Sequence, residues 1–265
     1  PSIPYQSLGF QMAFSSHDQD SYFGKRNYDI NQNSFYSSLI YNSIIGSTLN
    51  KIKVGLNFSY DDFDEIVDIS KTSYNRIDNS IGGFFEYSYD SLDALSLVAG
   101  IRYDIHNNLG SFFTPRFHLR YQPFEKSVLR LSAGSGRKSS NIFSENQNIF
   151  TSGRKIKISK QLGEFYGLDP EKAFNYGLSF RQGFFINNRE GDITFDYYVT
   201  DFENQVIVDW ETQGEVSFYN LDGKSFAKSL QIDLEYQLSN NILIKSTFKN
   251  FDVKKQYNSG LKINP

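Results

Sequence analysis

Residues 77–133, which read IDNSIGGFFEYSYDSLDALSLVAGIRYDIHNNLGSFFTPRFHLRYQPFEKSVLRLSA, decide the fold. Apolar and polar side chains alternate along the runs 95–105, 117–121 and 129–133. Successive side chains of a β-strand point to opposite faces of its sheet, so a period of two predicts strands with one apolar and one polar face. The polar rows carry charge in mid-strand, as at Arg102, which an ordinary surface strand does not explain.

The same alternation continues through the rest of the chain. It predicts strands near 8–14, 34–45, 52–60, 77–89, 174–180, 193–199, 230–238 and 242–248, with a separate hairpin within 206–219. We expect about eleven antiparallel strands and no helix. Connections at 46–50, 91–93, 123–126, 188–191 and 239–241 are short, whereas those at 17–33, 62–75, 136–173 and 203–225 are long and 107–111 is a shorter exception. Short turns at one rim and long loops at the other are typical of outer-membrane β-barrels.

Composition restricts the classes of protein that fit this pattern. The chain has 265 residues with 25 Phe, 18 Tyr, a single Trp, no Cys and a formal charge of −3. Absent cysteine excludes disulfides and thiolate metal sites within the chain, and the small net charge gives no support to nucleic-acid binding. Aromatic residues favour strands and also membrane interfaces.

Two arrangements place the apolar rows differently. A soluble barrel or sandwich packs them inside, whereas a membrane barrel turns them toward lipid and encloses a polar lumen. Tyrosines occur at both ends of the predicted apolar rows: Tyr60 and Tyr103 toward the long loops, and Tyr87, Tyr89, Tyr121 and Tyr236 toward the short turns. Such a pattern resembles the two aromatic girdles of a membrane barrel and favours the second arrangement.

Arginines on the polar rows also favour the membrane-barrel arrangement. Pairing across 107–111 would place Arg102 roughly opposite Arg116, and the next turn brings Arg120 and Arg130 together. Like charges opposite each other destabilise a bare sheet, so nearby carboxylates or another domain must compensate them.

Several segments resemble the barrel of TonB-dependent outer-membrane receptors of the Bacteroidetes type. They are GIRYD at 100–104, TPRFHLRY at 114–121, LRLSAGSGR at 129–137, NIFSEN at 141–146, EKAFNYGL at 171–178 and DYYVTDFENQV at 196–206. The resemblance runs over nearly the whole chain. It implies an all-β, antiparallel, up-and-down transmembrane barrel of about 22 strands, closed by an N-terminal plug domain, in the outer membrane of a Gram-negative bacterium.

The function that this resemblance implies is uptake of a scarce nutrient, such as a ferric siderophore, haem or cobalamin. The inner-membrane TonB–ExbB–ExbD complex would supply energy by pulling on the plug. Other expected partners are outer-membrane lipid and a small-molecule or metal-chelate ligand. We expect residues 1–265 to be part of one barrel domain, without the plug, the signal peptide and the terminal barrel strands.

Two groups of residues are candidates for functional contacts. In the long 136–173 connection, ligand contact is expected of Asn141, Phe143, Glu145, Asn146 and Arg154. On the lumen face, plug contact is expected of Arg102, Arg116, His118, Arg120 and Arg130. We expect no resident cofactor and no metal site, because the three histidines are dispersed and the acidic stretch 61–65 lacks the glycine and ligand spacing of a calcium loop.

Other functions remain open at this point. A structural or adhesive surface barrel would show the same strands without a plug in the full-length protein. An outer-membrane enzyme barrel would need a nucleophile and a base clustered at one rim, and no such motif stands out. We therefore do not expect an enzyme, and the identity of the ligand is beyond the sequence.

Overall fold

The computed structural model describes residues 4–67, 72–91, 94–159 and 166–264. Its elements are β1 (Ser7–Phe23), β2 (Arg26–Ile45), β3 (Ser47–Val67), β4 (Thr72–Ser73), β5 (Arg76–Asp90), β6 (Leu95–His106), β7 (Gly110–Tyr121), β8 (Ser127–Lys138), the 3-10 helix η1 (Ser144–Thr151), β9 (Lys155–Ile158), β10 (Glu171–Ile186), β11 (Arg189–Asn204), β12 (Val206–Asp209), β13 (Glu215–Asn220), β14 (Ser225–Ser239), β15 (Ile242–Tyr257) and β16 (Gly260–Asn264). Within these ranges, no helix is long and apolar enough to span a membrane.

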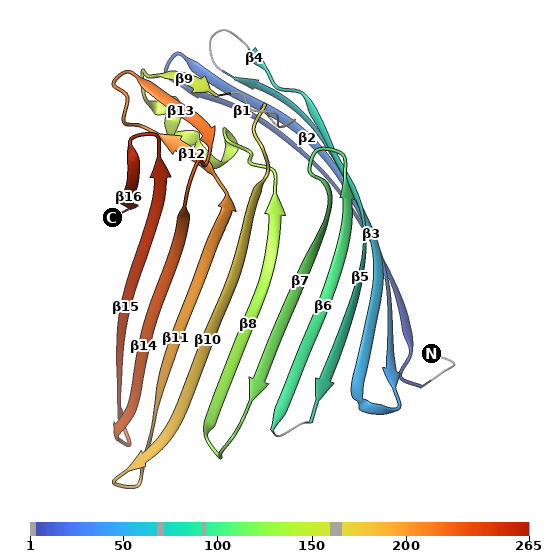
Figure 1. Ribbon diagram of the computed structural model, residues 1–265, viewed down its shortest axis with the longest axis vertical. Helices are drawn as coiled ribbons and strands as arrows, with labels where there is room; N and C mark the ends of the chain where they lie inside the picture. Colours follow the sequence, from blue (N-terminus) through green and yellow to red (C-terminus); the bar gives the residue numbers. More distant parts are fainter. Residues whose placement is uncertain (1–3, 68–71, 92–93, 160–165, 265) are drawn as a thin grey trace.

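One antiparallel sheet forms a curved wall (Figure 1). Its order is β1-β2-β3-β5-β6-β7-β8-β10-β11-β14-β15-β16, with β4 paired to β3, so each long strand lies beside the next one in the chain. The expected up-and-down architecture is confirmed, and the wall is an open portion of a barrel. The hairpin expected within 206–219 is also confirmed, as β12 and β13, but η1 was not expected.

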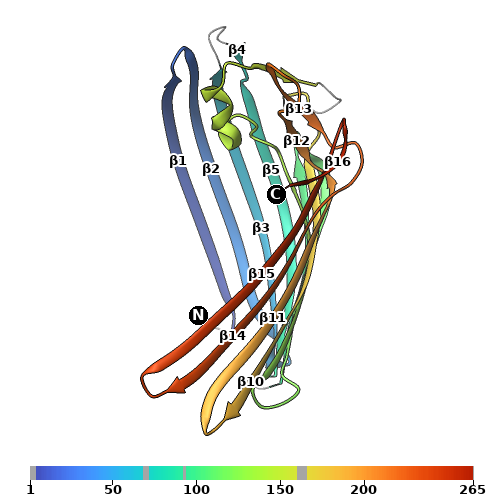
Figure 2. The same ribbon diagram turned by 90° about the vertical axis from the view of Figure 1, so that its left-hand side faces the viewer.

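The apolar rows face outward, as the membrane-barrel arrangement requires. The exposed side chains on this face include one from each of β1, β3, β5, β6 and β7, namely Phe10, Leu56, Phe85, Ile101 and Phe117. The wall curves around η1 and the small sheet β12-β13-β9 (Figure 2), which cover the opposite, polar-row face at one rim. We call this inner face the lumen face.

Connections at one rim are all short, as expected, and include Gly46 and the Asn187–Asn188 turn. Both asparagines have positive φ, 50° and 63°, which suits a two-residue hairpin. At the opposite rim, 139–170 and 205–224 are long, whereas 24–25, 107–109 and 258–259 are short. We call these the short-turn rim and the long-loop rim.

Two expected loops are wrong. Most of 17–33 belongs to the β1–β2 hairpin, whose turn is Gly24–Lys25, and β3 continues to Val67, so the acidic stretch 61–65 is strand. Beyond the lipid-facing rows, both faces of a strand meet water or other loops. Polar composition there no longer separates strand from loop.

The predicted register of the arginines is partly wrong. Arg102 lies opposite Thr114, and Arg116 lies opposite Gly100, because the β6–β7 hairpin closes at the pair His106–Gly110. The predicted pairing of Arg120 with Arg130 is confirmed.

Close packing on the lumen face gives a first testable prediction. Gly177 of β10 lies opposite Tyr198 of β11, and a Cβ at Gly177 would come 2.1 Å from a ring carbon of Tyr198. We expect Gly177→Val to lower the free energy of unfolding by about 1–3 kcal/mol through overpacking. Urea unfolding of the full-length protein refolded into lipid vesicles would measure this.

Gly136 of β8 provides the matched control, because nothing lies within 4 Å of a Cβ placed there. Gly136→Val should change stability much less, and Tyr198→Ala should reduce the cost of Gly177→Val. Equal losses at the two glycines would contradict the packing argument.

Candidate functional site at the lumen mouth

The long connections form a packed unit at the long-loop rim. We call residues 139–159, 166–170 and 205–224 the loop cluster. β9 pairs in parallel with β13, and β13 pairs with β12. The buried apolar core is made of Tyr28, Ile30, Phe63, Val67, Ile142, Phe143, Ile149, Phe150, Tyr166, Leu168, Val206, Val216 and Phe218. Because Tyr28, Ile30, Phe63 and Val67 of this core come from the wall strands β2 and β3, the loop cluster is packed onto the wall.

A fully buried carboxylate lies where the loop cluster meets the wall. Glu65 of β3 is 0% exposed, and its Oε2 pairs with Arg76 Nη1 of β5 at 2.7 Å. The Tyr28 hydroxyl donates to Glu65 Oε1 at 3.0 Å, and the Tyr166 hydroxyl donates to Oε2. Burial, followed by the charge of Glu65, raises the pKa of Tyr166, so this hydroxyl stays protonated and remains a donor.

Arg76 links this carboxylate to the loop cluster. Its Nη2 donates to Asn141 Oδ1 at 2.7 Å. Its guanidinium lies 4.0 Å from the ring centroid of Phe63 and 5.0 Å from that of Tyr166. Aromatic faces attract cations, so both rings stabilise the charge of Arg76 as well as covering it.

All five predicted ligand-contact residues lie in the loop cluster, with different surroundings. Asn141 accepts the bond from Arg76, and Phe143 is 1% exposed within the core. Glu145 is exposed and pairs with Lys138 at 3.1 Å, whereas Asn146 donates to the Ile142 carbonyl at 2.9 Å. Arg154 donates to the Trp210 carbonyl at 2.6 Å and lies over its ring. Ligand contact by these residues stays a prediction, and Glu145 is the most open to it.

Sequence reasoning missed Glu65, Arg76, Tyr166 and Trp210. The signal for Glu65 was present, because the lumen-facing alternation of β3 continues through Phe63, Glu65 and Val67. The contacts of the other three join segments that are distant in the chain, so no local pattern revealed them.

The predicted plug-contact residues lie on the lumen face in two electrostatic settings. Arg102 donates to both carboxylate oxygens of Asp104 at 2.6 Å, and Arg116 forms an ion pair with Glu86. The wall carboxylates Asp104 and Glu86 therefore compensate these two arginines.

The other three form what we call the basic patch: His118, Arg120 and Arg130. Arg120 donates to Gln122 Oε1 at 2.8 Å, which brings no negative charge. Neither His118 nor Arg130 makes a hydrogen bond or ion pair within the described ranges, and both are exposed. Among the described residues, no wall carboxylate forms an ion pair with Arg120 or Arg130, which lie opposite each other.

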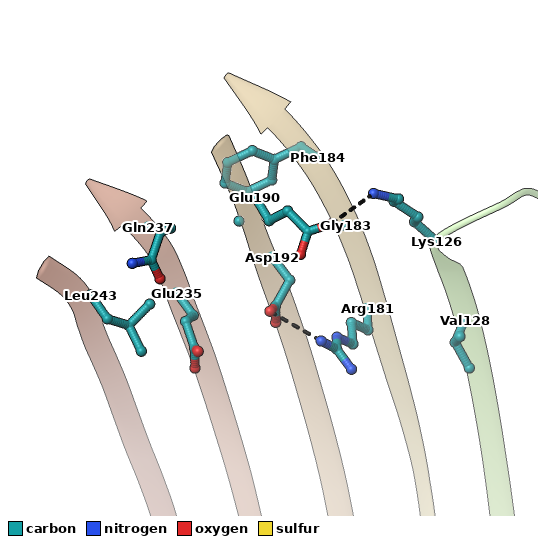
Figure 3. Close-up of a pocket in the computed structure, with 11 residues that line it drawn as sticks. Lys126, Val128, Arg181, Gly183, Phe184, Glu190, Asp192, Glu235, Gln237 and Leu243 are labelled. Carbon is teal, nitrogen blue, oxygen red and sulfur yellow. Dashed lines mark hydrogen bonds and ion pairs between the residues drawn. The ribbon is translucent and has the colours of Figure 1, made fainter. Parts of the chain in front are cut away.

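A pocket of about 470 Å³ lies on the lumen face at the short-turn rim (Figure 3). It is lined by strands β8, β10, β11, β14 and β15 and carries charges of both signs. Lys126 pairs with Glu190 at 3.4 Å, and Arg181 pairs with Asp192 at 3.1 Å. No group of three or more His, Asp or Glu side chains able to hold a metal ion occurs in the described part of the chain.

Comparison with solved structures shows the same fold. The siderophore receptor PirA of Pseudomonas aeruginosa matches with a TM-score of 0.57 at 13% identity, over 98% of this chain and 58% of that one. The ferric enterobactin receptor PfeA of the same organism matches with a TM-score of 0.58 at 12% identity, over 96% and 48%. The ferripyoverdine receptor of Pseudomonas aeruginosa, solved with bound ferripyoverdine, matches with a TM-score of 0.56 at 11% identity, over 98% of this chain and 39% of that one. The chain thus spans about half the length of these proteins.

The sequence comparisons are more specific. No curated protein matches the sequence. The family described as "TonB dependent receptor-like, beta-barrel" matches residues 3–263, and the match is to the family as a whole rather than to the receptors of one bacterial group. The chain therefore belongs to the TonB-dependent receptor β-barrel family, whose members lie in the outer membrane of Gram-negative bacteria.

Proposed function

We propose that this chain is part of the barrel wall of a transporter that imports a scarce nutrient of the ferric siderophore, haem or cobalamin kind. Energy would come from the TonB–ExbB–ExbD complex of the inner membrane. The family match across residues 3–263 is the observation that carries this proposal. The outward apolar rows and the polar lumen face support it, because they suit a wall between lipid and an aqueous path.

The transport sequence begins at the long-loop rim, which faces the exterior. Outer loops, including the loop cluster, and the apices of a plug domain bind the ligand. The plug then rearranges when TonB pulls on it, and the ligand moves along the polar lumen face. Of the five predicted ligand-contact residues, Glu145 is the exposed one and is therefore the best placed for the first contact.

Growth of a deletion strain tests this function. A strain lacking the full-length gene should fail to grow with at least one ferric siderophore, haem or cobalamin as the limiting source, and the gene on a plasmid should restore growth. Unchanged growth on every source would overturn the proposal and favour a structural or adhesive barrel.

The basic patch is proposed as a contact for acidic side chains of the plug. Arg120 and Arg130 lie directly opposite each other, and no described wall carboxylate pairs with either, so the pair is unfavourable on a bare sheet. A plug that fills the lumen can supply the missing negative charge. Arg102 and Arg116 need this less, because Asp104 and Glu86 already pair with them.

Arg130→Glu in the full-length receptor tests this contact. Placing a carboxylate against acidic plug groups should weaken plug seating, since disrupting a buried hydrogen-bonded charge pair costs about 2–5 kcal/mol. We expect greater sensitivity to large antibiotics and reduced ligand uptake.

Lys25→Glu makes the same charge change in the turn between β1 and β2 and should leave both properties unchanged. Arg116→Glu is less informative, because it would also place a carboxylate beside Glu86. Normal permeability and uptake in Arg130→Glu would remove the basic patch from the plug interface.

A further inference from the structure

We infer that Glu65 is a positioning residue that fastens the β8–β10 connection to the wall at two points, so that this connection is a fixed strut across the lumen mouth. The strut is defined as residues 139–159 and 166–170. The inference rests on the proposed function in one respect, namely that the lumen mouth is the ligand entrance.

The first attachment is at the start of the strut. Arg76, paired with Glu65, donates to Asn141 Oδ1 at 2.7 Å. The Asn141 carbonyl in turn accepts the Glu145 amide at 2.9 Å and the Ser144 hydroxyl at 3.2 Å. Arg76 therefore holds the turn that leads into η1, and Glu65 holds Arg76.

The second attachment is near the end of the strut, on the same carboxylate. The Tyr166 hydroxyl donates to Glu65 Oε2. The Tyr166 ring also meets Phe143 edge to face, with centroids 5.4 Å apart, and Tyr74 of the β4–β5 connection at 5.3 Å. One buried side chain of β3 thus contacts, directly or through Arg76, two strut residues that are 25 positions apart in the numbering.

The middle of the strut is held by the β1–β2 hairpin. Arg26 donates to the carbonyls of Ile149 and Arg154. Phe150 is 1% exposed and stacks on Tyr28 at 5.2 Å, and Tyr28 itself donates to Glu65. The described strut residues are therefore held by three neighbouring strands, β2, β3 and β5.

Lifting the strut would be costly for a specific reason. Glu65 is fully buried, so removing Tyr166 and displacing Arg76 would leave a carboxylate short of its partners in an apolar site. The turn at 211–214, between β12 and β13, is exposed instead. Movement of the loop cluster during ligand entry would then occur at such tips, with the strut as their base.

Distance measurement between spin labels tests the strut. Cysteines replace Asn31 on the exposed face of β2 and Asn148 on the exposed side of η1 in the full-length receptor, and each carries a nitroxide. This chain contains no other cysteine. We expect one narrow distance distribution in membrane vesicles. Glu65→Gln, which keeps the size but removes the charge, should broaden it into several distances.

The Glu190→Gln variant, an exposed carboxylate at the short-turn rim, is the matched control and should keep the narrow distribution. If Glu65→Gln does not give a folded, heat-modifiable barrel, Tyr166→Phe replaces it, because it removes only the strut's own hydroxyl. In Tyr166→Phe, amide exchange within the strut should quicken about tenfold for a lost hydrogen bond to a charged group.

A broad distribution in the unmodified receptor would overturn the fixed strut. A narrow distribution in Glu65→Gln, or unchanged exchange in Tyr166→Phe, would overturn the role of Glu65. None of these measurements uses a ligand, so they fail or succeed independently of the growth assays that test the proposed function.

Discussion

The Arg76→Met variant is expected to lose about 3–5 kcal/mol of unfolding free energy, the cost of leaving one member of a buried ion pair without its partner. Glu65 is 0% exposed and the Arg76 side chain is 10% exposed, so water does not replace the lost guanidinium. Methionine keeps a similar length and apolar character, which limits the loss of packing. Urea unfolding of the receptor in lipid vesicles, followed by tryptophan fluorescence, measures the change.

Arg181→Met is the control for this prediction. Arg181 pairs with Asp192 at 3.1 Å, but its side chain is 53% exposed. Solvent screens such a pair, so the variant should lose only about 0–1 kcal/mol. Similar losses of unfolding free energy in the two variants would show that burial does not make the Glu65–Arg76 pair more important for stability than an exposed pair.

Ile101→Lys is expected to impair insertion of the barrel into the membrane. Ile101 is 48% exposed on the outward face of β6, between Phe85 and Pro115 of the neighbouring strands. A lysine there must lie in hydrocarbon, which costs about 2–4 kcal/mol near the bilayer midplane. The fraction of heat-modifiable, membrane-inserted barrel should fall, and the denaturant midpoint should fall with it.

Ser132→Lys introduces the same charge on the lumen face. Ser132 lies opposite His118 and Gly177, away from the apolar rows. Insertion of this variant should be close to normal, because the added ammonium group meets water or the plug. If Ser132→Lys impaired insertion as much as Ile101→Lys, the assignment of the two faces would be wrong.

Much of the wall was predictable because its signal is local. Alternation within 95–105 and 117–121 indicates the face of the sheet on which each side chain lies. This face depends only on the extended backbone, in which successive side chains point to opposite sides. The failures at 17–33 and 61–65 have one cause. Those segments extend past the lipid, where no outward apolar row is required and strand looks like loop.

The candidate site was predictable only in outline. The length of 136–173 drew attention to the right segment, but the pattern did not show that Phe143 is buried among Tyr74, Phe150 and Tyr166. The contact between Tyr166 and Glu65 spans 101 positions. Such contacts depend on how the strands are arranged in three dimensions, which hydrophobic periodicity does not record.

The parallel pairing of β9 with β13 has a consequence for the order of folding. Most neighbouring wall strands are joined by short turns, so each can add to the growing sheet with a small loss of chain entropy. β9 and β13 are separated by β10, β11 and β12, and their partnership closes a far longer stretch of chain. Pairings of that kind form slowly. We therefore expect the mouth of the barrel to assemble after the wall beneath it, as a late step in maturation.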